Sequence, residues 1–99
     1  MGEQLVYAPK LLAADSRTAF QEQALRALRD LGEAEPGKLV IDLSHTDRVD
    51  SSGLSTLVQL QLRAAERRHT VRLTGVSEEL RFLLLMTRLE DRFEIQPRE

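Results

Sequence analysis

A short apolar run, residues 39–43 (Leu-Val-Ile-Asp-Leu), constrains the fold more than any other segment of the chain. Its leucine and β-branched residues are nearly continuous, which is typical of a strand that is buried on both faces of a parallel sheet. Further along the chain, apolar residues recur at the spacing of an amphipathic helix: Leu54, Leu57, Val58, Leu62 and Ala65. A doubly buried strand followed by such a helix predicts an α/β fold.

Strand-like and helix-like segments alternate along the rest of the chain. The candidate strands are residues 5–7, with 10–13 as a continuation after Pro9, and residues 71–73 and 92–95. The candidate helices run from a cap at Asp15 or Ser16 to Gly32, from 52 to 67, and from 78 to 88. The alternation predicts one domain over residues 1–99, with a mostly parallel sheet of four to five strands. We expect helices mainly on one side, an antiparallel first strand at the edge, and a broadly buried last helix because Leu80 and residues 82–86 are all apolar.

Composition excludes several classes of function. The net charge of −2 gives no electrostatic reason to bind nucleic acid, and no apolar run is long enough for membrane insertion. The chain has no cysteine, and its two histidines, His45 and His69, are far apart and expected in surface loops. We therefore expect neither a metal nor a cofactor. The polar first residues lack the apolar segment of a signal peptide, so the expected location is cytoplasmic.

The junction between the central strand and its helix carries the most chemistry. It reads Val49-Asp50-Ser51-Ser52-Gly53-Leu54, with two hydroxyls and an acid at the start of a helix. A helix start exposes unpaired N–H groups and a partial positive charge, so it can position a hydroxyl and tolerate a phosphate on it. The simpler interpretation is a helix cap alone. A hydrolase site built from Ser51, His45 and Asp50 is disfavoured because the Gly-x-Ser-x-Gly elbow is absent.

These segments together resemble the STAS domain, the fold of bacterial anti-sigma factor antagonists. The resemblance rests on residues 39–43, on Asp50-Ser51-Ser52-Gly53-Leu54, and on the later segments 71–76 and 85–95, and it covers about residues 10–96. Two features depart from the family pattern. Residues 9–14 lack the acids usual before the first helix, in a loop that often touches the kinase, and Arg88 stands where a glycine is common.

The resemblance implies a regulator that is not an enzyme. Family antagonists bind an anti-sigma factor that is also a serine kinase of the GHKL type; phosphorylation releases them, and a phosphatase resets them. The phosphorylated residue would be Ser51, with Asp50 positioning its hydroxyl and with Ser52 and Gly53 forming the first helical turn. The alternative is a STAS subunit that docks on the permease of an ABC-type phospholipid transporter.

A partner surface can also be predicted from the sequence. We expect it to include the polar loop before the junction and the outer side of the following helix, where Leu60 would be an exposed anchor. The predicted contact residues are Ser44, His45, Thr46, Asp47, Thr56 and Leu60.

Overall fold

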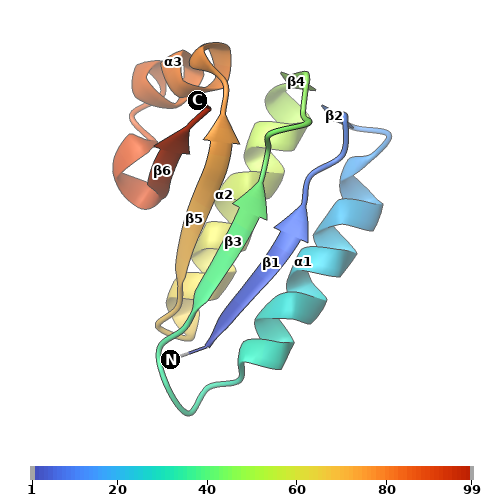
Figure 1. Cartoon of the computed structure of the whole chain (residues 1–99). Coiled ribbons are helices and arrows are strands. Elements are labelled where there is room, and N and C mark those ends of the chain that lie inside the picture. Colours follow the sequence, from blue (N-terminus) through green and yellow to red (C-terminus); the bar gives the residue numbers. More distant parts are fainter. Residues whose placement is uncertain (1, 99) are drawn as a thin grey trace.

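Strands and helices alternate along the chain as the sequence predicts (Figure 1). The computed structural model describes residues 2–98. No helix within this range is both long and apolar enough to span a bilayer. The elements are β1 (Glu3–Tyr7), β2 (Leu11–Leu12), α1 (Arg17–Leu31), β3 (Lys38–Asp42), β4 (Arg48–Val49), α2 (Ser51–Glu66), β5 (Thr70–Val76), α3 (Glu78–Met86), a 3-10 turn η1 (Glu90–Arg92) and β6 (Glu94–Pro97).

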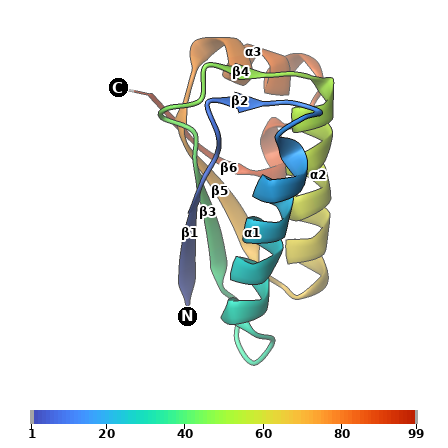
Figure 2. The same ribbon diagram turned by 90° about the vertical axis from the view of Figure 1, so that its right-hand side faces the viewer.

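The main sheet has four strands in the order β1-β3-β5-β6, and every neighbouring pair is parallel. The prediction of an antiparallel first strand is therefore wrong: Leu5 pairs with Val40 in a parallel register. Helix α1 carries the chain from the end of β1 back to the start of β3, and such a crossover makes adjacent strands parallel. Helices α1 and α2 cover the same face of the sheet, as predicted (Figure 2).

Strands β2 and β4 form a separate parallel sheet of two residues each, in which Leu11 pairs with Arg48 and Leu12 with Val49. This small sheet lies at the carboxyl end of the main strands, beside the first turn of α2 (Figure 2). The continuation of the first strand after Pro9 therefore exists, but it pairs with the segment that leads into Ser51 instead of extending the main sheet.

The core lies between the sheet and helices α1 and α2. Its central residues are fully buried: Leu39 and Ile41 of β3, Leu57 and Leu60 of α2, and Leu73 of β5. Figure 1 and Figure 2 show that α3 crosses the end of the sheet instead of covering its face.

That position of α3 explains why the prediction of a broadly buried last helix is wrong. Only Leu80 and Leu84 are buried in this helix. Phe82, Leu85 and Met86 are 62%, 56% and 65% exposed.

His69 is buried, which contradicts its prediction as a surface residue, whereas His45 is exposed as expected. The backbone N–H of Gly37 donates to His69 Nδ1 at 2.8 Å, and His69 Nε2 lies 2.7 Å from the carbonyl oxygen of Gly32. A carbonyl can only accept, so Nε2 carries the proton and Nδ1 does not. The ring therefore ties the turn before β3 to the turn before β5.

Candidate functional site

Ser51 is the first residue of α2, and its side chain is exposed. Asp50 is the N-cap residue, and its carboxylate accepts a hydrogen bond from the N–H of Gly53 at 2.9 Å. The Asp50 carbonyl accepts from the N–H of Leu54 at 2.9 Å. Within residues 2–98, the Ser51 hydroxyl has no hydrogen-bond partner. The helix therefore has its cap from the aspartate, and the serine hydroxyl remains free at the surface.

Gly53 is required by a close approach of β2 to the first turn of α2. A Cβ atom on Gly53 would lie 2.1 Å from the carbonyl oxygen of Leu12. That same oxygen accepts a hydrogen bond from the N–H of Asp50 at 3.2 Å. The glycine of the junction thus lets the backbone of β2 bond directly to the residue that caps α2.

Further bonds join the two segments that form the small sheet. The Thr46 hydroxyl donates to the carbonyl of Pro9 at 2.9 Å, and the Asp47 N–H donates to the carbonyl of Lys10 at 2.7 Å. The Lys10 ammonium also lies 3.7 Å from the Asp47 carboxylate, although both side chains are largely exposed. Residues 9–12 and 46–50 therefore form one bonded unit that carries Ser51 at its end.

The two short strands direct their side chains alternately inward and outward. Leu12 is fully buried and Val49 is half-buried, whereas their neighbours Leu11 and Arg48 are exposed. Leu11 is 54% exposed although it is a large apolar residue. Its position opposite Arg48 places an apolar side chain beside a positive charge, on the unit that carries Ser51. Neither residue is among the predicted contacts, because strands of two residues leave no periodicity in the sequence.

The polar loop before the small sheet is organised by Asp42. The carboxylate of Asp42 accepts from the Ser44 hydroxyl at 2.6 Å and from the Ser44 N–H at 2.8 Å. These bonds, with a smaller contribution from His45, lower the pKa of Asp42 against the opposing effect of partial burial. Because the Ser44 hydroxyl proton is directed at Asp42, the 3.1 Å contact with His45 Nδ1 does not activate this serine as a nucleophile.

The structure places the predicted contact residues in two groups. Ser44, His45 and Asp47 are exposed, as the prediction requires. Thr46 is 4% exposed, and Thr56 and Leu60 are fully buried, so their prediction as surface contacts is wrong. The Thr56 hydroxyl donates to the Ser52 carbonyl at 2.9 Å, which allows this polar residue to face the sheet. Leu60 is a core residue and cannot be an exposed anchor.

Comparisons with known proteins agree with this architecture. A family model described as "Mlab, STAS domain" matches residues 11–97. A search of curated protein sequences found no match.

Solved structures similar to this chain share its fold at low sequence identity. A proposed anti-sigma factor antagonist from Thermotoga maritima has a TM-score of 0.75 at 18% identity, over 93% of this chain and 78% of its own. An anti-sigma-factor antagonist (STAS) domain protein from Planctomyces limnophilus has a TM-score of 0.72 at 19% identity, over 96% of this chain and 82% of its own. A sulfate transporter family protein from Wolinella succinogenes has a TM-score of 0.70 at 16% identity, over 95% and 75%. With a family model matching most of its length, this chain belongs to the STAS-domain family.

Proposed function

We propose that this protein is an anti-sigma factor antagonist that binds a GHKL-type anti-sigma factor kinase when unphosphorylated and is released when Ser51 is phosphorylated. The observation that supports this most directly is the free, exposed hydroxyl of Ser51 on the first residue of α2. The protein acts by binding and not by catalysis, and it works in the cytoplasm, where such a kinase and a resetting phosphatase meet it.

The position of Ser51 suits a switch that changes binding without unfolding the domain. Phosphorylation adds about −1.5 to −2 charges and three acceptor oxygens. At the start of a helix these oxygens can accept from backbone N–H groups, and the partial positive charge of the helix favours them. An interface that closes over the phosphate must remove its water, and a loss of ~3 kcal/mol weakens binding more than a hundredfold.

The partner surface that we propose is the outer side of the small sheet together with Ser51. Leu11 supplies an exposed apolar contact in place of Leu60, and Lys10, Asp47 and Arg48 supply charges around it. The bonds between residues 9–12 and 46–50 support this choice, because they hold these side chains on one rigid unit. A rigid surface loses less entropy on binding than a flexible loop does.

The test is phosphorylation of the purified protein by its cognate kinase with ATP. Intact-mass measurement should show a gain of one phosphate in the wild type and in Ser52→Ala, but no gain in Ser51→Ala. Titration calorimetry should then show that the phosphorylated wild type binds the kinase at least tenfold more weakly. A gain of one phosphate in Ser51→Ala would refute the proposed site, and equal affinity of both forms would refute the switch.

A second function has one specific observation in its favour, the match of residues 11–97 to a family model described by the name Mlab. In this alternative the chain is a STAS subunit that docks on the permease of an ABC-type phospholipid transporter. Co-purification separates the two proposals. The transporter subunit would be recovered with a permease and an ATPase, and Ser51→Ala would leave that complex unchanged.

A further inference from the structure

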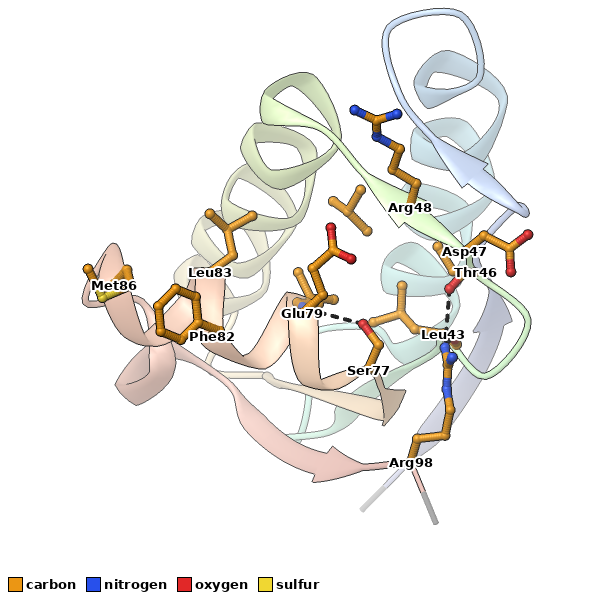
Figure 3. A pocket seen from close by; sticks show the side chains of 12 residues that line it. Leu43, Thr46, Asp47, Arg48, Ser77, Glu79, Phe82, Leu83, Met86 and Arg98 are labelled. Carbon is orange, nitrogen blue, oxygen red and sulfur yellow. Dashed lines mark hydrogen bonds between the residues drawn. The ribbon is translucent and has the colours of Figure 1, made fainter.

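Helix α3 and the loop region between β3 and α2 enclose a groove that adjoins the proposed partner surface and shares Asp47 and Arg48 with it. Its volume is about 200 Å³ (Figure 3). Half of the side chains that line it are apolar: Leu43, Val49, Leu80, Phe82, Leu83 and Met86. We call this cavity the α3 groove.

The size and lining of the α3 groove suit a small apolar group. An apolar cavity of roughly 150 Å³ accepts benzene, so the α3 groove has room for a ring or for a chain of about six to ten heavy atoms. Water over apolar walls lacks hydrogen-bond partners and is displaced readily. Phe82 and Met86 are mostly exposed at one end of the groove, and a bound chain would cover both.

The other end of the groove is polar, because Arg98 lies there (Figure 3). Arg98 Nε donates to the Gly75 carbonyl at 3.1 Å, and Nη2 donates to the carbonyls of Leu43 and Thr46 at 2.8 and 3.1 Å. Nη1 has no acceptor within residues 2–98, and the guanidinium forms no ion pair with a carboxylate in that range. Three carbonyls hold the group in place without neutralising its charge, so an anion can still bind at Nη1.

Ser77 adds a second donor on the α3 side of the groove. Its Oγ accepts from the N–H of Leu80 at 3.1 Å, which caps α3 and leaves the hydroxyl proton available. Two carboxylates also line the groove, Glu79 and Asp47, and they oppose the binding of any strongly negative ligand. Two guanidinium groups, those of Arg98 and Arg48, line the groove with these two acids, so its charges balance and a ligand with one negative charge is repelled less than a phosphate dianion.

We propose that the α3 groove binds a free amphiphilic monocarboxylate. Its carboxylate accepts from Arg98 Nη1, and its alkyl chain or ring lies over Leu83 toward Phe82 and Met86. This inference does not depend on the function proposed for Ser51.

The test compares two ligands of the same shape, octanoate and the neutral octanamide, by NMR titration of the isotope-labelled wild type. Octanoate should bind saturably and about threefold to fivefold more tightly than octanamide, the effect expected of one solvent-exposed charge pair. The shifted resonances should be those of α3, Arg98 and residues 43–49. Equal or weaker binding of octanoate, no saturable binding, or shifts confined to another surface would each overturn the proposal.

Matched variants test the two ends of the groove separately. Met86→Glu should weaken octanoate binding several-fold, whereas Leu62→Glu, at a comparably exposed apolar residue on α2, should leave it unchanged. Glu79→Gln should strengthen octanoate binding. Arg98→Gln should remove the preference for octanoate over octanamide. A variant that merely loosened β6 would weaken the binding of both ligands, so the ratio of the two affinities reports the lost charge alone. A preference that survives in Arg98→Gln would contradict the assigned role of Arg98.

Discussion

At the scale of single residues, Gly53 shows how a backbone contact can dictate an amino acid. By helix propensity alone, replacing an interior glycine by alanine stabilises a helix by up to ~1 kcal/mol. Here the added Cβ would lie 2.1 Å from the Leu12 carbonyl oxygen, so the backbone of β2 would have to move. We therefore expect Gly53→Ala to lower the free energy of unfolding by about 1–3 kcal/mol, as overpacking does.

Urea denaturation measures this change, and Ser52→Ala, at the half-buried neighbouring residue, is the matched control. The control should change stability by less than ~0.5 kcal/mol, as most substitutions away from special contacts do. A Gly53→Ala protein as stable as the wild type would show that the close contact between the Leu12 carbonyl and the first turn of α2 does not require a glycine.

His69 gives a second prediction at this scale, because its bonds determine which ring nitrogen is protonated. Long-range ¹H–¹⁵N spectra at neutral pH should show the Nε2–H form alone, with Nδ1 unprotonated. His69→Ala leaves the Gly37 N–H and the Gly32 carbonyl without partners, so it should cost about 1–3 kcal/mol of stability. His45→Ala, in an exposed loop, is the control and should cost much less. A mixture of both tautomers would contradict the bonding described here.

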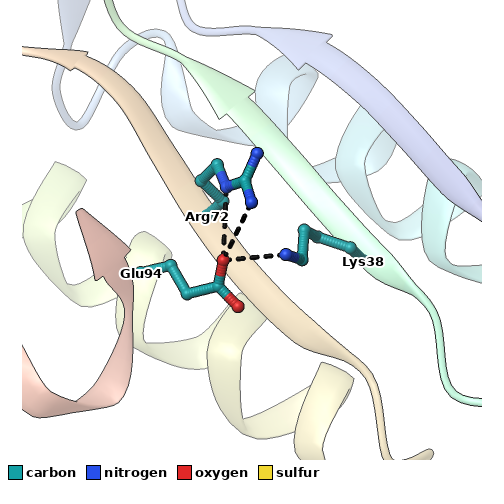
Figure 4. Close-up of polar contacts among 3 residues, drawn as sticks. All are labelled: Lys38, Arg72 and Glu94. Atoms are coloured by element: carbon teal, nitrogen blue, oxygen red, sulfur yellow. Dashed lines mark hydrogen bonds and ion pairs between the residues drawn. The ribbon is translucent and has the colours of Figure 1, made fainter. Parts of the chain in front are cut away.

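At the scale of elements, one carboxylate links three strands on the face of the sheet opposite α1 and α2. Glu94 of β6 accepts from Lys38 of β3 at 2.8 Å and from Arg72 of β5 at 3.2 Å (Figure 4). The hydrogen bond from Lys38, assisted by Arg72 and opposed by partial burial, lowers the pKa of Glu94 below its ordinary value of 4.5. The folded state therefore releases this proton at a lower pH than the unfolded state does.

The stability that follows from this shift is fully present above the unfolded pKa, and it is lost as the pH falls through the folded pKa. The Glu94 side chain is 46% exposed, so we expect Glu94→Gln to cost no more than ~1 kcal/mol at pH 7. The difference from the wild type should shrink as the pH falls below about 4.5. Urea midpoints measured across this range provide the test, and a difference that grows toward acid would contradict it.

Helix α2 shows why the sequence identified an element but misjudged its orientation. The apolar pattern suggested that the buried face comprises Leu54, Leu57, Val58, Leu62 and Ala65. Leu57 is indeed buried, but Leu54 and Val58 are half-buried, and Leu62 and Ala65 are exposed. The buried face consists of Gly53, Thr56, Leu57, Leu60 and Ala64. A glycine needed for a backbone contact and a threonine that satisfies its own hydroxyl do not look hydrophobic, so no apolar pattern could reveal them.

At the scale of the whole molecule, the alternation of elements was sufficient to predict the layers, and the doubly buried β3 identified the centre of the sheet. The alternation did not predict the direction of the edge strand β1, because its parallel pairing with β3 depends on how α1 carries the chain back along the sheet. The junction around Ser51 was predicted because its residues are contiguous in sequence. The surroundings of Leu11 and Arg98 were not predicted, because the residues that these side chains lie beside are distant in the chain and only the fold brings them together.

Leu60 and Leu11 are both leucines, but the fold buries the first and exposes the second. Leu60→Glu places a charge in the core, so it should abolish cooperative unfolding. Leu11→Glu should change stability by less than ~0.5 kcal/mol. If the proposed partner surface is correct, Leu11→Glu should also weaken binding to the cognate kinase by about tenfold or more, which is ~1.4 kcal/mol.

Thermal denaturation and calorimetric titration together measure these outcomes. Leu62→Glu, at another exposed leucine away from the small sheet, should affect neither quantity. Kinase affinity that is unchanged in Leu11→Glu would place the interface elsewhere on the molecule.

The shared direction of all four strands has a practical consequence for any binding assay. Their carboxyl ends emerge at one pole of the molecule, together with Ser51 and Arg98, whereas Glu3 begins β1 at the opposite pole (Figure 1). A biosensor chip or fluorescent fusion attached ahead of Glu3 leaves the pole that carries Ser51 facing outward. Attachment beyond Arg98 would crowd it, so the direction of tethering can itself decide whether a partner is detected.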